Sequence, residues 1–149
     1  MEQFIRDHFA IITVIGVANL ALVLVPSIVY RLTRSKKIPT IPKQDVLYFE
    51  RWVSGVSHKN LLTKLGGANH CLSITLSQTA LVIKPMAPFN LMFFAEIYDL
   101  EHAITRTSVQ SIKPNGDAGL IVEFESDGVP KRIDLTLRKR DEFFRALDS

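Results

Sequence analysis

The feature that most constrains this chain is a long apolar segment near its N-terminus. No charged residue occurs between Phe9 and Tyr30. As an α-helix, the 21 residues of range 10–30 rise about 31 Å, roughly the thickness of the hydrocarbon core of a bilayer. A cleavable signal peptide would have cations before a shorter apolar core. The sequence therefore predicts a permanent transmembrane helix, whose only polar side chains are Thr13, Asn19 and Ser27.

Four cations follow this segment directly and form its membrane flank. They are Arg31, Arg34, Lys36 and Lys37, whereas Arg6 is the only basic side chain before the segment. Because cytoplasmic flanks of transmembrane helices carry the excess of Lys and Arg, we predict the N-terminus outside and the rest of the chain in the cytoplasm. The same four side chains would meet anionic headgroups, although setting the topology is sufficient reason for them.

The basic character of the chain belongs to this flank and not to the part that follows it. The net charge is +3 and the pI is about 9.1, which alone would suggest nucleic-acid binding. Residues 1–37 carry five Lys or Arg and two acidic residues, whereas residues 38–149 carry 13 of each sign. We therefore expect no nucleic-acid partner. The single cysteine, Cys71, excludes an intrachain disulfide and suits a reducing compartment.

The chain divides into four segments. We predict an extracytoplasmic N-terminus over residues 1–9, the transmembrane helix over 10–30, a juxtamembrane linker over 31–45 and one domain over 46–149. The linker is basic and carries Pro39 and Pro42, which favour an extended spacer. The length that remains after the linker is enough for one compact domain and not for two.

Alternation of apolar and polar residues predicts an antiparallel sheet in this domain. In "VPKRIDLTLR", Ile133, Leu135 and Leu137 share one face, as in a half-buried strand. The dipeptide Asp127-Gly128 before it is a strong hairpin signal. Such patterns predict about seven strands. Besides "VPKRIDLTLR", the predicted strand segments are "VLYFERWVSGV", "CLSITLS", "ALVIK", "EHAIT", "VQSIK" and "GLIVEFES".

Two short helices accompany the predicted strands. The terminal segment "RKRDEFFRAL" suits a helix that covers the open end of a sheet, with an apolar face of Phe143, Phe144 and Leu147. The segment "SHKNLLTKLGG" predicts a second helix, capped by Ser57 and ended by Gly66. Its apolar face comprises Leu61, Leu62 and Leu65.

This order of elements resembles the pleckstrin-homology-like and GRAM-like domains, in which seven antiparallel strands are closed by one C-terminal helix. The resemblance covers roughly Val46 to Leu147 and rests on "LSITLSQTALVI", "HAITRTSVQSI" and "RKRDEFFRAL". The chain looks like small bacterial membrane proteins that place such a domain after one or more spans. The resemblance implies a mainly-β barrel with a capping helix, a bacterial inner-membrane location, and a binding or adaptor role for lipid or protein.

The connection after the first strand differs from that of phosphoinositide-binding members. Those proteins carry a dense Lys/Arg signature there, whereas this chain has only Lys59 and Lys64. The next strand offers Leu72, Ser73 and Ile74 where cations would be expected. The resemblance therefore does not extend to specific phosphoinositide recognition. Lys59 and Lys64 are candidate contacts for anionic lipid in general, or else ordinary solvated lysines.

An unusually apolar connection, "KPMAPFNLMFFAEIYDL", follows the third predicted strand. One interpretation is a segment that packs on the barrel and enlarges its core, because apolar clusters are usually buried. The other is an exposed patch that meets a partner or the bilayer. The candidate residues for that contact are Phe89, Leu91, Met92, Phe93 and Phe94.

No catalytic, metal or cofactor motif is recognisable. His58, His70 and His102 lack the spacing of a zinc motif, and no second cysteine assists them. Cys71 follows His70, but neighbours in a strand point to opposite faces, which prevents a nucleophile–base pair. We therefore predict no catalytic residue, no metal ligand and no cofactor.

Two functions from different classes remain. The first is a single-pass, membrane-anchored adaptor whose cytoplasmic domain recruits a protein partner or helps to assemble a membrane complex. The second is a domain that lies on the cytoplasmic membrane face and reads anionic lipid. A small membrane-tethered enzyme is a remote alternative, because no polar groups are predicted to converge in a pocket.

Overall fold

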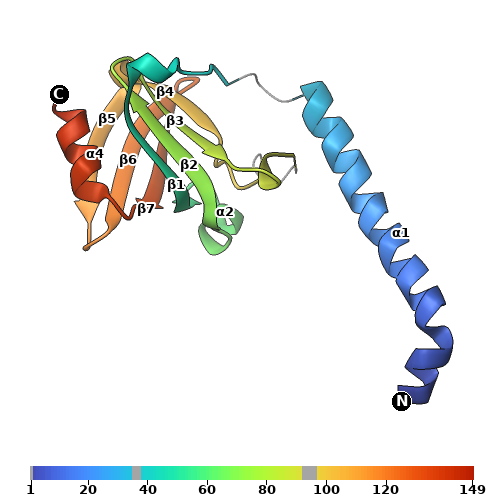
Figure 1. Ribbon diagram of the computed structural model, residues 1–149. Helices are drawn as coiled ribbons and strands as arrows, with labels where there is room; N and C mark the ends of the chain where they lie inside the picture. Colours follow the sequence, from blue (N-terminus) through green and yellow to red (C-terminus); the bar gives the residue numbers. More distant parts are fainter. Residues whose placement is uncertain (1, 35–37, 92–96) are drawn as a thin grey trace. The chain divides into compact units, whose positions relative to one another are not determined.

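The computed structural model describes residues 2–34, 38–91 and 97–149, which form two compact units (Figure 1). One unit holds the N-terminal helix, α1 (Glu2–Arg34). Its stretch Ile11–Tyr30 has a mean hydropathy of 2.4 and is long and apolar enough to cross a membrane. Of the four predicted flank cations, Arg31 and Arg34 lie in the last turn of α1, and Lys36 and Lys37 lie outside the described residues.

The three polar side chains within the apolar part of α1 each donate a hydrogen bond to the helix itself. Thr13 Oγ1 lies 2.7 Å from the carbonyl oxygen of Phe9. Asn19 Nδ2 lies 2.8 Å from the Ile15 oxygen, and Ser27 Oγ lies 2.6 Å from an oxygen four residues earlier. Because hydrocarbon offers no partner to polar groups, such internal bonds lower the cost of placing them in a membrane.

The second unit is a seven-stranded antiparallel sheet with a C-terminal helix, as predicted. The strand order is β4-β3-β2-β1-β7-β6-β5, so the two edge strands, β4 and β5, are consecutive in the chain and joined by the 3₁₀ turn η3 (Arg106–Ser108). The strands are β1 (Val46–Ser57), β2 (Ala68–Ser77), β3 (Ala80–Pro85), β4 (His102–Thr105), β5 (Val109–Asn115), β6 (Gly119–Ser126) and β7 (Val129–Thr136). The helices and remaining turns are η1 (Lys43–Asp45), α2 (Leu61–Leu65), η2 (Phe89–Leu91) and α4 (Arg140–Leu147).

Strand β1 is shared by both halves of this sheet. It is 12 residues long and pairs with β2 along most of its length, whereas only its last part, Ser54–Ser57, also pairs with β7. Trp52 lies between these parts with a φ of 63°, and the register with β2 shifts between Arg51 and Val53. Such a β-bulge bends a strand and increases its twist, which allows β1 to run from one half of the sheet into the other.

The bulge also changes which side chains of β1 face the core. Before it, Tyr48 and Glu50 are buried, as alternate residues of a strand should be. After it, the buried positions are Val53 and Gly55, because Trp52 adds one exposed residue to the alternation. A strict period of two over the whole segment would have directed Val53 outward.

One apolar core fills the inner face of the curved sheet. His102 on β4 and Phe124 on β6 meet edge to face with ring centres 5.1 Å apart, although their strands are not neighbours, so the sheet is rolled around the core. Helix α4 adds Phe143, which is fully buried and lies 5.3 Å from the ring centre of Tyr48. The predicted covering helix is therefore confirmed. Other fully buried side chains are Val53, Leu72, Ile74, Leu76, Leu81, Ile83, Leu120, Ile133, Leu135 and Leu137.

A buried carboxylate joins β1 to the start of α4. Glu50 accepts hydrogen bonds from the backbone N–H of Arg138 at 2.7 Å and of Lys139 at 3.2 Å, and from the hydroxyl of Tyr48. Burial, together with the bond to Glu50, raises the pKa of Tyr48 far above its ordinary value. Since Lys139 is the residue that precedes α4, the carboxylate also lies at the positive end of that helix.

Helix α2 forms where it was predicted and ends before Gly66, but its cap was predicted wrongly. Of its predicted apolar face, Leu61 and Leu65 are exposed, and the side chain of Leu62 lies outside the described part of the chain. The cap is Asn60 and not Ser57: Asn60 Oδ1 accepts from the Thr63 N–H at 2.8 Å, and Thr63 Oγ1 accepts from the Asn60 N–H at 2.9 Å. These bonds direct Thr63 inward, where it is fully buried. Leu61 and Leu65 lie on the opposite side of the single turn, with exposed fractions of 73% and 79%.

We expect Glu50→Ala to lower the free energy of unfolding by about 2–4 kcal/mol, because two backbone donors and the Tyr48 hydroxyl lose a buried, charged acceptor. Urea unfolding of the full chain in detergent micelles, followed by Trp52 fluorescence, measures this loss. Glu125→Ala, at an exposed position of β6, is the matched control and should stay within about 0.5 kcal/mol. Equal losses in the two variants would contradict the assigned role of Glu50.

Candidate interaction surface at the α2 end of the sheet

Three connections meet at one end of the sheet, away from α4. The connection β1–β2 contains α2, and its Gly66 lies against the ring of Tyr98 in the connection β3–β4, where a side chain at position 66 would collide with that ring. Lys131, just after the β6–β7 turn, binds Asp99 of the same β3–β4 connection with both Nζ–carboxylate distances at 3.0 Å. Figure 1 shows α2 and α4 at separate places on the sheet.

The predicted lipid contacts Lys59 and Lys64 lie in the connection that carries α2, next to the two exposed leucines. Both lysines are exposed. In residues 38–91 and 97–149, neither forms an ion pair, in contrast to Lys131, which binds Asp99. The connection therefore presents Lys59, Leu61, Lys64 and Leu65 together to the outside; we call these four residues the α2 tip.

The apolar connection β3–β4 is described only in part. Phe89 begins the turn η2 and is 43% exposed, and Ile97 is 39% exposed. Leu91 ends η2, and the predicted contact residues Met92, Phe93 and Phe94 lie outside the described residues. Where it is described, this connection adds partly exposed apolar side chains to the protein surface.

A hollow of about 310 Å³ separates the start of the α2 connection from the β6–β7 turn. His58 and Lys59 line one side, and Val129 and Lys131 line the other. The side chain of Val129 is 55% exposed. Because the hollow contains both cationic and acidic groups, including the Asp99 carboxylate that already binds Lys131, it does not have the uniform positive charge that a multiply charged anion would require.

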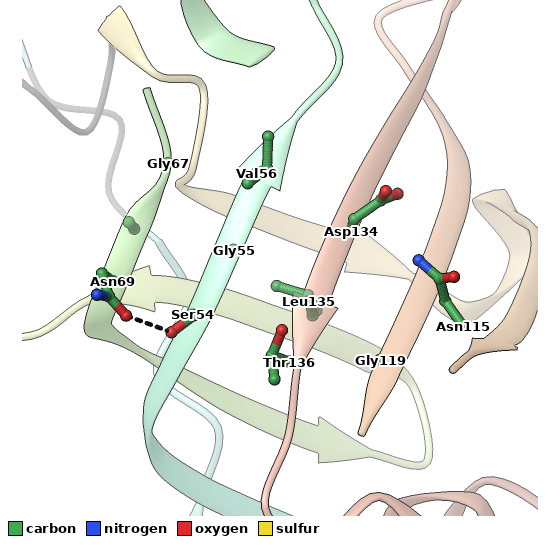
Figure 2. A pocket seen from close by; sticks show the side chains of 11 residues that line it. Ser54, Gly55, Val56, Gly67, Asn69, Asn115, Gly119, Asp134, Leu135 and Thr136 are labelled. Carbon is green, nitrogen blue, oxygen red and sulfur yellow. Dashed lines mark hydrogen bonds between the residues drawn. The ribbon is translucent and has the colours of Figure 1, made fainter. Parts of the chain in front are cut away.

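A second hollow, of about 440 Å³, lies on the outward face where β1 pairs with β7 (Figure 2). Ser54 Oγ donates to Asn69 Oδ1 at 3.0 Å and accepts from the His70 N–H at 3.0 Å. Thr136 and Asn115 supply further polar groups, and Gly67 and Gly119 supply no side chain. Five strand or loop segments build this hollow, so no single stretch of sequence could have indicated it.

Asp134, at the edge of that hollow, is already engaged by two basic side chains. Its carboxylate lies 3.0 Å from His58 Nε2 and 3.0 Å from Arg132 Nε. Burial by itself would raise the pKa of Asp134, but the hydrogen bond from Arg132 and the charge of His58 outweigh it and lower that pKa. Asp134 is therefore a structural anion that ties the end of β1 to β7, and not a free base.

The candidate chemical residues of the sequence do not come together. His58 binds Asp134, His70 is exposed on β2 with a φ of 52°, and His102 is buried with its Nε2 at 2.7 Å from the backbone oxygen of Asp99. Burial raises the pKa of the Cys71 thiol, which disfavours the reactive thiolate. Among the described residues, no three His, Cys, Asp or Glu side chains are close enough to hold one metal ion.

Comparison with known proteins adds no assignment: no protein-family model matches the chain, and no curated protein and no solved structure is significantly similar to it.

We expect His102 to make folding stability depend on pH. Burial, the largest influence, lowers the pKa of His102 below its ordinary value of about 6.5, against the opposing effect of Asp99. Below pH 6.5 the unfolded chain then binds more protons than the folded chain, so stability falls as the pH drops, by at most about 1.4 kcal/mol per pH unit.

His102→Gln keeps a side-chain N–H for the Asp99 oxygen but cannot titrate, and it should remove this fall between about pH 6.5 and pH 5. Urea midpoints at several pH values measure the effect. His70→Asn, at an exposed position with positive φ, is the control and should keep the wild-type profile. A His102→Gln profile parallel to that of the wild type would refute the assignment.

Proposed function

We propose that this chain is a single-pass, membrane-anchored binding module of a bacterial inner membrane, with α1 as the anchor and the sheet unit in the cytoplasm. The hydropathy of Ile11–Tyr30 supports the anchor, as do the internal hydrogen bonds of Thr13 and Asn19. The cations that follow the apolar stretch support the orientation. Binding is favoured over catalysis because candidate side chains for chemistry are engaged in structural contacts: His58 pairs with Asp134, and His102 is buried against the backbone oxygen of Asp99.

The sheet unit is proposed to be a pleckstrin-homology-like domain. Its support is the antiparallel strand order, in which β1 joins the β2–β4 and β5–β7 portions, and the single C-terminal helix α4 packed at one end. In this arrangement the end with α4 is closed by Phe143, and the end with α2 is left for contact with another molecule. Fold alone does not define the ligand, so the proposal for the ligand depends on the exposed side chains.

We further propose that the α2 tip contacts the anionic surface of the same membrane. The observation that carries this proposal is the exposure of Leu61 and Leu65 beside Lys59 and Lys64. A buried leucine is worth about 1.5–3 kcal/mol and a lysine near an anionic surface about 1 kcal/mol. The sum corresponds to weak binding, yet a tether that holds the domain near the membrane supplies a high effective concentration. The contact is therefore expected to be reversible and sensitive to salt.

The orientation predicts where a reporter works. We expect a cytoplasm-dependent fluorescent protein fused after Ser149 to be active, and a periplasm-dependent phosphatase at the same position to be inactive, because the cations follow the span. Replacing Arg31 and Arg34 with Glu and adding Lys before the span moves the positive flank to the N-terminal side. We expect part of the protein molecules then to insert with the opposite topology. Activity of the phosphatase fusion alone would overturn the proposed topology.

The lipid contact is tested with a probe on α2. Leu65→Cys in a Cys71→Ser background carries an environment-sensitive fluorophore, and the full chain is placed in nanodiscs. We expect the emission to be higher in discs with phosphatidylglycerol than in discs of phosphatidylcholine alone. Added salt should lower the emission again to the level in phosphatidylcholine discs. Replacing Lys59 and Lys64 with Glu should abolish the rise.

The matched control is the same fluorophore at Asp117→Cys, in the turn between β5 and β6 beside α4. This position is exposed, and its turn is held at the start of α4 by the bond from Arg140 to the Gly116 oxygen, so its emission should not depend on lipid charge. Equal responses at the two positions would show a general effect of the disc and would reject the α2 tip as the contact. No response at position 65 would also reject it.

A further inference from the structure

Strand β1 exposes two aromatic side chains on the outward face of the sheet. Phe49 is 50% exposed and Trp52 is 53% exposed. Between them, Arg51 lies with its Cζ 5.5 Å from the ring centre of Phe49, a cation–π distance. This surface is separate from the α2 tip, because α2 follows the end of β1 whereas Phe49 and Arg51 lie before the bend of the strand and Trp52 lies at it.

The residue at the bend is unexpected for its backbone conformation. A φ of 63° suits Gly or Asn, and a bulky residue in this region costs about 1 kcal/mol or more. The bulge needs an extra residue at position 52, but it does not need an indole, and Trp52 is 53% exposed and not part of the buried core. A side chain that is strained and also exposed indicates a role outside the fold.

The composition of the surface fits a protein partner. Tryptophan, arginine and phenylalanine are the side chains enriched where protein–protein binding energy is concentrated. Phe49 and Arg51 stand on the face of a strand and not on a protruding loop, so a bilayer is the less suitable occupant. Val82, in the same cross-strand row as Phe49 through Thr75, is buried, so the exposed aromatic surface does not continue onto β3 in this row.

Lys84 adds a second cation to the face that carries Arg51, which makes this surface positive. Arg51 pairs with Ser73 and Ser73 pairs with Lys84, so the two cations share one face about 10 Å apart across two strand spacings. Both are exposed, and neither forms an ion pair with a carboxylate in the described part of the chain. A second copy of this chain would bring like charges together across a twofold interface, which disfavours self-association here.

We infer that Phe49, Arg51, Trp52 and Lys84 form a docking surface for an acidic protein segment that also carries apolar side chains. The carboxylates of the partner would pair with Arg51 and Lys84, and its apolar side chains would cover the two rings. This inference goes beyond the lipid contact and does not depend on it. With both, the chain holds a recruited protein at the membrane while its α2 tip contacts lipid.

The chain itself provides the readout, because Trp52 is its only tryptophan. The full chain is placed in phosphatidylcholine nanodiscs and titrated with a tryptophan-free amphipathic peptide rich in Glu and Leu. We expect a saturable blue shift of the Trp52 emission as the indole becomes covered. The counterpart peptide, with Lys in place of Glu, should give no saturable shift.

Three variants define the contact. Arg51→Glu combined with Lys84→Glu should weaken binding of the Glu-rich peptide about tenfold or more and create binding of the Lys-rich peptide. Phe49→Ala should weaken binding of the Glu-rich peptide without changing the charge of the surface. Lys64→Glu, on the α2 tip, should leave peptide binding unchanged while reducing the response to lipid, so the two proposals fail separately. Thermal unfolding of each variant checks that the exposed substitutions leave the fold intact.

The inference is overturned if neither peptide shifts the emission, if both shift it equally, or if the double Glu variant binds the Glu-rich peptide as the parent does. Vesicles of phosphatidylglycerol form the last arm of the experiment. A blue shift with these vesicles and not with the Glu-rich peptide would assign this face of β1 to lipid and would also overturn the inference.

Discussion

The extra residue in strand β1 is the constraint on which the rest of the sheet unit depends. Because Trp52 inserts one position into the alternation, the strand is able to pair with β2 along most of its length and with β7 only after the bend. Glu50 faces inward before the bend by regular alternation, and the insertion allows Val53 to face inward after it. The change in which side chains of β1 face the core therefore follows from this local irregularity in the backbone.

The two ends of the sheet differ in how they use polar groups. At one end, the Glu50 carboxylate satisfies backbone donors at the entry to α4, and Phe143 completes the core. At the other end, Lys131 binds Asp99 and Thr63 is held by Asn60, so the local polar groups serve the connections themselves. Leu61 and Leu65 of α2 are left outside, which is why we propose a binding contact there and not at the α4 end.

Much of the architecture was predictable because it depends on local patterns. Alternating residues identified the seven strands, and Asp127-Gly128 has the positive φ values of a tight hairpin turn, as its sequence indicated. The orientation of Leu61 and Leu65 was not predictable in this way. A helix of five residues has too few apolar positions to determine its own buried side, and the bonds between Asn60 and Thr63 decided it instead.

The sequence by itself determined the apolar helix near the N-terminus, the strands with their turns and the terminal helix, because each follows from the periodicity or hydropathy of neighbouring residues. It also determined the separation of the basic flank from a neutral domain. Only the tertiary structure decided which apolar side chains stay outside, among them Phe49 and Trp52 on β1 and Leu61 and Leu65 on α2. Burial depends on which distant segments pack over a residue, and that information is present only once the sheet has rolled around its core.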